Sequence, residues 1–170
     1  DPNDVSTYGE GILVDFLEKS TVKNCWTTGS LTGGEYFEKF IGGVVGTVVG
    51  NSTVSGCYST ATITGKYSGS GYNDKYVYWY YDSLGGIVGG MIYGSLSISD
   101  CWFGGEIIVD SIQALVGGIV GAVEDTDIQN CMVTTESIEK DPITDDDNTC
   151  WVAYLFDGTV ENCYWPDNEK

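Results

Sequence analysis

The residues of this chain that could do chemistry are carboxylates, thiols and aromatic rings. Histidine and arginine are both absent, so the chain cannot form a Ser-His-Asp or Cys-His nucleophilic site or a histidine-ligated metal centre. Acid–base catalysis remains open, either by two carboxylates that face one cleft or by a base with a cationic stabiliser. Asp82, Asp100 and Asp110 are the candidate acids for that chemistry.

The charge balance limits the partners. Seven lysines oppose 25 acidic residues, which gives a formal net charge of -18 at pH 7. Such a surface repels phosphate backbones and anionic lipid headgroups, and without arginine it lacks the bidentate phosphate fork. We therefore expect no nucleic-acid partner.

The chain lacks the segments that would direct it into a membrane. It contains no apolar run of about 18 residues, so we expect no membrane insertion by this segment. The opening DPNDVSTYGE has neither the basic nor the apolar region of a secretion signal. The abrupt start and stop predict that these 170 residues are part of a larger polypeptide.

Five of the six cysteines stand in one repeating sequence context. Segments such as STVKNCWTTGSLTG, STVSGCYSTATITG and LSISDCWFGGEIIV align on their cysteine. The aligned residues are Cys25, Cys57, Cys101, Cys131 and Cys163, at spacings of 32, 44, 30 and 32 residues. One period with a single long insertion indicates a repeat architecture.

A glycine-rich apolar phrase precedes the cysteines. IGGVVGTVV, LGGIVGG and VGGIVGAV are near copies, and Gly11, Gly43, Gly86 and Gly118 lie 13 to 15 residues before the next aligned cysteine. In the last repeat the phrase has changed to CWVAYLF, which places Cys150 at the second glycine's position. This degenerate unit, residues 147–165, is predicted to be the C-terminal capping repeat.

The repeat unit predicts the fold. Each unit holds three short runs rich in valine, isoleucine, threonine and aromatic residues, without sustained helical periodicity. This is the content of one coil of a parallel β-helix. We predict an all-β fold, a parallel β-helix (β-solenoid) of about five coils with three short strands per coil, as a single domain over residues 1–170. By analogy with other β-helices the coil is expected to be right-handed.

The residue before each aligned cysteine predicts a corner of the coil. This position is held in turn by Asn24, Gly56, Asp100, Asn130 and Asn162. Glycine, asparagine and aspartate tolerate the left-handed backbone that a corner requires. Because stacked coils are about 4.8 Å apart, Val44, Ile87 and Ile119 should form one inward aliphatic ladder. The glycines beside them would let the sheet bend or another backbone approach.

The stacked cysteines are predicted to be free thiols. Side chains at equivalent positions run parallel about 4.8 Å apart, whereas a disulfide needs converging Cβ atoms about 3.8 Å apart. One buried cysteine per coil instead acts as a small apolar residue. A zinc cluster is not expected, because the chain has no C-x2-C pair.

The combination of GGIVG, a strand ending in N/D-C-Y/W and a following threonine- and glycine-rich strand resembles the GLUG-motif repeat. The similarity runs over residues 9–165, interrupted by the insertion. Proteins with this motif are bacterial surface or secreted proteins, including adhesin-like chains and the non-catalytic regions of immunoglobulin-A-cleaving metallopeptidases. The resemblance implies a surface-exposed, extracellular β-solenoid. It transfers no catalytic residue, because the chain lacks the His-Glu-x-x-His zinc motif of those peptidases.

The long spacing between Cys57 and Cys101 contains an aromatic-rich insertion, residues 66–83. Aromatic side chains with polar edges suit contacts with sugars and proteins, because they bury a large area at low entropic cost. The predicted ligand-binding residues are Tyr72, Tyr76, Tyr78, Trp79, Tyr80 and Tyr81. The alternative is that YVYWYYD is an ordinary strand of the coil.

A second set of large side chains follows the aligned cysteines directly. It comprises Trp26, Tyr58, Trp102, Met132 and Tyr164. If each cysteine points inward, the next residue points outward, which predicts a stripe along one face. Such a stripe either grips an extended glycan or covers the sheet beneath neighbouring loops.

Acidic and threonine-rich segments complete the candidate sites. The stretches 124–127 and 141–148 could attract calcium, but neither follows the calcium-loop pattern, and clustered carboxylates are usually solvated. No metal and no cofactor is predicted. The pairs Thr27 and Thr28, Thr60 and Thr62, and Thr134 and Thr135 do not hold one register, so no ice-binding array is expected.

These patterns favour a non-enzymatic module of a bacterial surface or secreted protein. We expect it to serve adhesion, with a glycan or a host or bacterial surface protein as partner, or to act as a stalk. The alternative is a carbohydrate-active enzyme on a β-helix, for which five coils make a short groove and seven lysines are few to neutralise an anionic sugar. A purely structural spacer is the third hypothesis, because a solenoid fragment must cap its strand edges or associate.

Overall fold

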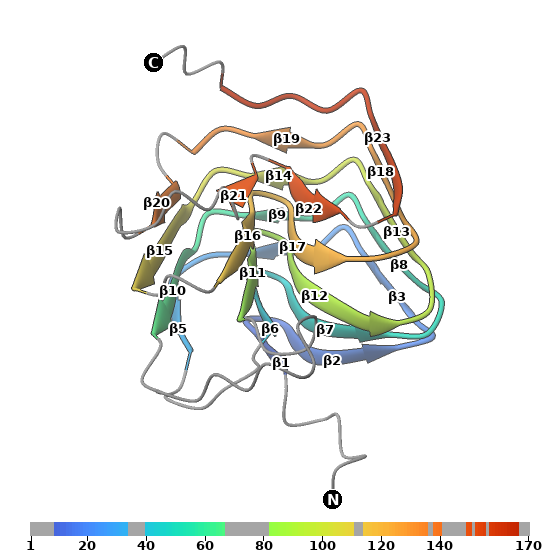
Figure 1. Cartoon of the computed structure of the whole chain (residues 1–170), viewed down its shortest axis with the longest axis horizontal. Helices are drawn as coiled ribbons and strands as arrows, with labels where there is room; N and C mark the ends of the chain where they lie inside the picture. The colour runs from blue at the N-terminus through green and yellow to red at the C-terminus, as the bar shows by residue number, and fades with distance from the viewer. Residues whose placement is uncertain are drawn as a thin grey trace, which may run out of the picture.

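The computed structural model describes residues 9–33, 40–66, 82–110, 114–135, 138–140, 149–150, 152–155 and 157–166. Over these residues the chain forms the strands β1 to β23, and every strand pairing is parallel. None of the described segments forms a helix with the length and apolarity needed to cross a membrane. The structure is a stack of coils in which equivalent strands lie side by side (Figure 1).

Five parallel sheets run along the stack, and the chain visits them in the same order in each coil. Sheet A contains β1 (Gly9–Gly11), β6 (Phe40–Gly42), β11 (Ser83–Gly85), β16 (Leu115–Gly117) and β21 (Thr149–Cys150). Sheet B contains β2 (Val14–Glu18), β7 (Val45–Val49), β12 (Val88–Tyr93), β17 (Val120–Val123) and β22 (Ala153–Leu155). Sheet C contains β3 (Thr21–Lys23), β8 (Ser52–Ser55), β13 (Leu96–Ser99), β18 (Thr126–Gln129) and β23 (Gly158–Glu161).

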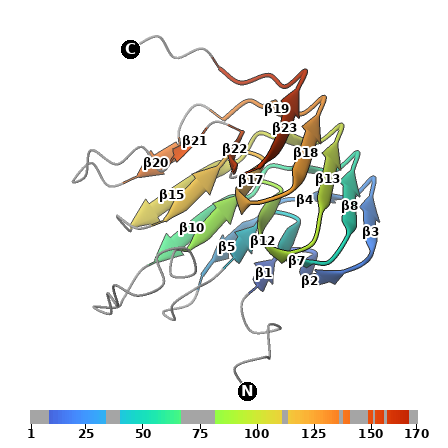
Figure 2. The ribbon, with the colours of Figure 1, turned by 45° about the vertical axis from the view of Figure 1, so that its right-hand side comes forward.

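Two further sheets complete each coil. Sheet D contains β4 (Trp26–Thr27), β9 (Tyr58–Ser59), β14 (Trp102–Phe103) and β19 (Met132–Val133), and a bridge from Met132 extends it to Tyr164. Sheet E contains β5 (Ser30–Thr32), β10 (Thr62–Lys66), β15 (Glu106–Asp110) and β20 (Ile138–Lys140). Figure 2 shows β3, β8, β13 and β18 as neighbouring layers of this stack. The prediction of a parallel β-helix is therefore confirmed.

The prediction of three strands per coil is wrong. Each of the first four coils contributes five short strands, one to each sheet. The backbone bends between sheets A and B, B and C, C and D, and D and E, and each bend separates two short strands, although backbone hydrogen bonds between coils, such as that from Asn24 N to Ser55 O, continue at the bends. A prediction of three strands per coil counts two short strands as one wherever a bend separates them.

The predicted corner is confirmed in all five coils. Asn24, Asp100, Asn130 and Asn162 have φ angles of 53°, 55°, 53° and 52°, and Gly56 has a φ of 61°. This column turns the chain from sheet C into sheet D. A second left-handed column, which we did not predict, turns sheet B into sheet C at Lys19, Gly50, Gly94 and Asp125, with φ angles of 43°, 68°, 109° and 43°.

The glycine phrase forms the bend between sheets A and B. A Cβ added to Gly42 would overlap the carbonyl oxygen of Val45, and one added to Gly85 would overlap that of Val88. In these two coils only a glycine allows this close approach. The register corrects the sequence alignment, because Gly11 and Cys150 belong to the column of Gly42, the first glycine of the phrase and not the second.

The core consists of columns that run through the coils. Val44, Ile87 and Ile119 are fully buried and linked by backbone hydrogen bonds from Val44 N to Ile87 O and from Ile87 N to Ile119 O, each 2.9 Å long. The predicted aliphatic ladder is therefore confirmed. On the opposite wall, Phe103 is fully buried against Gly86, where a Cβ would overlap the phenyl ring. The two walls of the coil can lie close together because a glycine on one wall, such as Gly86, leaves room for a side chain on the other, such as Phe103.

Candidate functional site

The six predicted ligand-binding aromatics lie outside the described residues. They are Tyr72, Tyr76, Tyr78, Trp79, Tyr80 and Tyr81. The described chain ends before them at Lys66, the last residue of β10, and resumes at Asp82, next to β11. The insertion therefore connects sheet E of the second coil to sheet A of the third.

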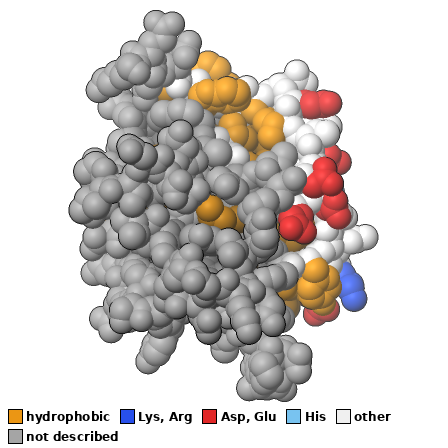
Figure 3. Space-filling view, in the orientation of Figure 1, with side chains coloured by type: hydrophobic (Ala, Val, Ile, Leu, Met, Phe, Trp, Pro, Cys, Tyr) orange, Lys and Arg blue, Asp and Glu red, His pale blue; other side chains and the backbone are white. Residues whose placement is uncertain are grey.

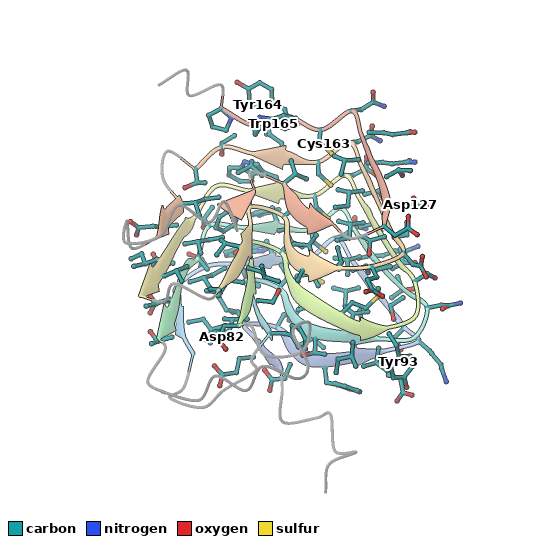
Figure 4. The ribbon with its side chains drawn as sticks, in the orientation of Figure 1. Asp82, Tyr93, Asp127, Cys163, Tyr164 and Trp165 are labelled. Atoms are coloured by element: carbon teal, nitrogen blue, oxygen red, sulfur yellow. The ribbon has the colours of Figure 1, made fainter. Side chains whose placement is uncertain are left out.

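A different set of side chains points outward on sheet D, and all of its members are exposed except Trp102, which is partly buried. It consists of Trp26, Tyr58, Trp102, Met132 and Tyr164, and we call it the aromatic stripe. Trp26 and Tyr164 are each 60% exposed, and Tyr58 and Met132 are each 40% exposed. The prediction that the residue after each cysteine points outward is therefore confirmed. Figure 4 shows Tyr164 at the outer end of the stack, beside Trp165.

Neighbouring rings of the stripe touch one another. The ring centroids of Trp26 and Tyr58 are 6.0 Å apart with planes within 10°, and those of Tyr58 and Trp102 are 5.9 Å apart at 36°. Aromatic pairs at such separations prefer an offset arrangement. The offset and the exposure of the rings leave apolar surface of each rung open to solvent.

The indole of Trp102 is fixed in position. Its Nε1 donates a 2.8 Å hydrogen bond to Oγ1 of Thr134, on the next coil. A Cβ added to Gly104 would lie 2.5 Å from Cζ2 of Trp102 and 3.0 Å from Oγ1 of Thr134. The indole thus extends over Gly104, and the absence of a side chain there makes room for it.

Two polar columns border the stripe. The left-handed corner column lies on one side, where the amide Nδ2 of Asn130 donates a 3.2 Å hydrogen bond to Oδ1 of Asp100. On the other side the register places Thr28, Thr60 and Thr134 in one column, all exposed. The prediction that the threonines share no register is therefore wrong for these three, because the alignment paired them with the buried Thr27 and with Thr62 and Thr135.

The stripe and its threonine column carry no charge. Residues 26–29, 58–61, 102–105, 132–135 and 164–166 contain neither an acid nor a lysine. Elsewhere acids are common: Glu18, Glu124, Asp125, Asp127 and Glu161 are all exposed. Figure 3 shows acidic side chains along the edge that holds β18 and β23. The chain therefore combines an acidic surface with one uncharged, apolar face.

The cysteine column anchors the stripe from below. Cys57, Cys101 and Cys131 are at most 2% exposed. The five described thiols are free, as predicted. Each donates a hydrogen bond to the carbonyl oxygen two residues before it, over 3.2 Å for Cys25, Cys101 and Cys131. The side chain of Cys150 lies outside the description.

The pKa values of the described thiols shift in both directions. Hydrogen bonding with the thiol of Cys101 lowers the pKa of Cys57 to about 6 and also lowers the pKa of Cys131. Contacts with the thiols of Cys131 and Cys57, together with burial, raise the pKa of Cys101 above the ordinary thiol range. Burial also raises the pKa of Cys163. Because Cys57, Cys101 and Cys131 are buried, the column serves packing and holds the next residue of each coil outward.

The two candidate acids whose side chains the structure describes, Asp82 and Asp100, lie in different parts of the coil. Asp82 is buried next to sheet A, whereas Asp100 is exposed at the corner between sheets C and D. The side chain of Asp110 and residues 141–148 lie outside the description. Asp127 accepts a 2.7 Å hydrogen bond from Oγ1 of Thr159. The described residues contain no group of three or more acidic or cysteine side chains arranged to hold a metal ion.

Comparisons with known proteins agree with the repeat. The family model described as the GLUG motif matches residues 113–139, a segment that corresponds to the fourth coil, β16 to β20. Searches of the curated proteins and of the solved structures found no match. The matched coil shares its corner, its cysteine and its glycine bend with the coils before it, which supports the interpretation of the chain as a GLUG-motif repeat protein.

Proposed function

We propose that the chain is a non-enzymatic binding module of an extracellular protein, a β-solenoid that presents an adhesive face to a glycan or to a surface protein of a host or bacterium. The observation that carries this proposal is the exposed, uncharged aromatic stripe in a chain with a formal net charge of -18. Contiguous exposed apolar patches commonly mark interaction sites. The GLUG motif supports a surface or secreted protein as the setting.

The scaffold supports a binding role. The three middle rungs of the stripe, Tyr58, Trp102 and Met132, each follow a buried cysteine and lie between two parallel neighbours, so this part of the face is preorganised. A preorganised face loses little side-chain freedom on binding. General acid–base catalysis on a sugar would instead use a pair of carboxylates, and the stripe contains no acidic residue.

The insertion is proposed as a second part of the adhesive surface. Its aromatic composition suits sugar or protein contacts. Its candidate residues are Tyr72, Tyr76, Tyr78, Trp79, Tyr80 and Tyr81. The stripe and the insertion can be tested separately, because they are separate segments of the sequence.

The test is a binding assay against glycan arrays and bacterial or host cell surfaces. It compares the wild type with Tyr58→Ala on the stripe, a double variant Tyr78→Ala/Trp79→Ala in the insertion, and Tyr93→Ala. Tyr93 is the matched control, because it is an aromatic residue 57% exposed on sheet B, away from the stripe. We expect the stripe variant to lose binding and the control to keep it.

The contrary results are also defined. If Tyr58→Ala still binds and the insertion variant does not, the binding site lies in the insertion and not on the stripe. Wild-type protein that binds neither surfaces nor glycans would favour the spacer hypothesis. In that case association through the ends of the solenoid, measured by light scattering at several concentrations, becomes the expected activity.

A further inference from the structure

We infer that the stripe binds a neutral, unbranched polysaccharide that lies along the axis of the solenoid. This inference rests on the proposed function and names the ligand of the same site. It is argued from the periodicity of the stripe, from the polar columns beside it and from its lack of charge.

The site repeats once per coil, so its ligand should repeat as well. Trp26, Tyr58 and Trp102 are joined by the register Trp26 to Tyr58 and Tyr58 to Trp102, and Met132 and Tyr164 continue the series. Coils rise by about 4.8 Å, a length comparable to one sugar ring of an extended chain. A linear polymer of similar rings can meet every rung in the same way, whereas a folded protein surface has no such repeat.

Three of the five rungs, those of Trp26, Tyr58 and Met132, offer both kinds of contact that a sugar needs, because Gly104 and Pro166 occupy the threonine position in the other two. The ring provides apolar surface for the C–H face of a pyranose, and Met132 can adapt its flexible side chain to the same face. The hydroxyls of Thr28, Thr60 and Thr134 border the stripe on one side. Hydroxyls donate and accept hydrogen bonds, as sugar hydroxyls do.

The corner column supplies the opposite border. Asn24, Asn130 and Asn162 are exposed and carry amides that both donate and accept hydrogen bonds. The hydrogen bond from Asn130 to Asp100 fixes the orientation of that amide. The stripe is thus an apolar strip between two rows of neutral or acceptor groups, which favours a ligand with an apolar ring and hydroxyl groups at its rim.

Charge decides between neutral and anionic polysaccharides. The stripe and the threonine column contain no lysine, and the chain has no arginine and no histidine to pair with a carboxylate or sulfate. A formal net charge of -18 repels such polymers at long range. Uronic-acid and sulfated polysaccharides are therefore excluded, and neutral ones remain.

The test uses the whole chain and purified polysaccharides. The neutral probes are insoluble cellulose, insoluble chitin and soluble mixed-linkage β-glucan, and the anionic probes are pectate and chondroitin sulfate. Binding is measured by pull-down for the insoluble probes and by affinity electrophoresis and calorimetry for the soluble ones. Circular dichroism and thermal unfolding establish that each variant is folded.

Three substitutions probe the site by different means. Tyr58→Ala removes the central contact between Trp26 and Trp102. Gly104→Ala displaces the indole of Trp102 without removing any aromatic group, because the new Cβ would lie 2.5 Å from Cζ2. Thr60→Val removes one hydroxyl at nearly constant volume. We expect about a tenfold or larger loss of affinity for Tyr58→Ala, smaller losses for the other two, and no loss for Tyr93→Ala.

The dependence on ligand length gives a second readout. Affinity for oligosaccharides of the bound polymer should rise with each added sugar until the oligosaccharide covers the five rungs. The rise should end earlier in Tyr58→Ala, because that substitution divides the stripe. A single-sugar site would instead saturate with a monosaccharide or disaccharide, and that result would overturn the inference.

The remaining outcomes separate this inference from the proposed function. Stripe-dependent binding to a protein, or stripe-dependent self-association in sedimentation, with no binding to the neutral polysaccharides, would overturn the inference and keep an adhesive stripe. Preference for pectate or chondroitin sulfate would also overturn it. If the wild-type protein binds no polysaccharide, no protein and no cell surface, the proposed function itself is contradicted.

Discussion

Asn130 donates a 3.2 Å hydrogen bond through Nδ2 to Oδ1 of Asp100, 30 residues earlier, and both residues have a left-handed backbone, with φ angles of 53° and 55°. The bond joins equivalent corners of neighbouring coils. Asparagine and aspartate have two roles at such a corner. They tolerate the left-handed backbone conformation, and their side chains form hydrogen bonds between neighbouring coils.

The first prediction concerns this corner. Asn130→Ala should lower the free energy of unfolding by about 1–2 kcal/mol, because a Cβ without a local hydrogen bond disfavours the left-handed backbone. Asn130→Gly should cost less, since glycine adopts that backbone freely. Urea unfolding of the two variants measures the difference. Equal losses would mean that the side-chain hydrogen bond, and not the backbone, dominates the corner.

The second prediction concerns the close packing of Gly86 against Phe103 inside the coil. In Gly86→Ala the new Cβ would overlap the carbonyl oxygen of Gly118 and the ring of Phe103, so we expect a loss of more than about 3 kcal/mol or no folded protein. Gly29→Ala is the control, because Gly29 has a φ of 106° and no atom near its missing Cβ. It should cost only the backbone strain, about 1–2 kcal/mol. Comparable thermal shifts in the two variants would contradict the close packing.

The third prediction concerns thiol accessibility. Cys57, Cys101 and Cys131 are at most 2% exposed, whereas Cys25 and Cys163 are partly exposed. Iodoacetamide should therefore modify Cys25 and Cys163 in the native protein and reach the other three only after unfolding. Peptide mapping by mass spectrometry identifies the modified sites. Rapid native modification of Cys101 would contradict the burial of the column.

The fourth prediction concerns alkaline pH. Burial raises the pKa of Cys163, so the folded protein keeps this proton at pH values where the unfolded chain has lost it. The stabilising contribution is complete below the ordinary thiol pKa, about 8.5, and is lost as the pH rises through the folded-state pKa. The difference in free energy of unfolding between the wild type and Cys163→Ala should therefore shrink toward alkaline pH. A difference that stays constant would show that Cys163 has the same pKa in both states.

The fifth prediction concerns the ring stack. A double-mutant cycle of Trp26→Ala and Tyr58→Ala, measured by chemical unfolding, should give a coupling free energy of about 0.5–1.5 kcal/mol, as expected for aromatic pairs. The pair Trp26 and Tyr93 lies on different sheets and should show additive effects. Additivity in the first pair would mean that the rings of the stripe do not support one another.

The repeat made much of this fold predictable. The cysteine column, the corner at Asn24 and its equivalents, and the ladder of Val44, Ile87 and Ile119 each follow from one residue type recurring at one position. Stacked coils place such residues over one another, so a column in the sequence becomes a column in space. The outward stripe followed from strand alternation alone.

Other features were hidden because their residues vary. The second corner is formed by Lys19, Gly50, Gly94 and Asp125, and lysine does not signal a left-handed backbone. The fifth coil was misaligned because Cys150 replaces a glycine, and nothing local indicates which glycine of the pair it replaces. The sequence predicts three strands per coil instead of five because the bend between sheets D and E is formed by different residues in each coil. It lies at Thr28 and Gly29 in the first coil and at Gly104 and Gly105 in the third.

The candidate site was only partly predictable. The sequence drew attention to the crowded tyrosines of residues 67–81, because composition is visible without a fold. The stripe draws its apolar area from single residues about 30 positions apart, such as Trp102 and Met132. Its lack of charge also becomes visible only when residues 26–29, 58–61 and 102–105 are placed side by side.

The stacking of coils also determines how the molecule should respond to mechanical load. Among the described strands, each coil pairs only with the coils directly before and after it, so tension applied at the two ends of the chain concentrates on the outermost coil. Rupture should then proceed one coil at a time, and each event would release about 30 residues, or about 100 Å of extended chain. If the solenoid links an adhesive protein to its surface, this stepwise unfolding would dissipate the energy of a sudden pull before the attachment breaks.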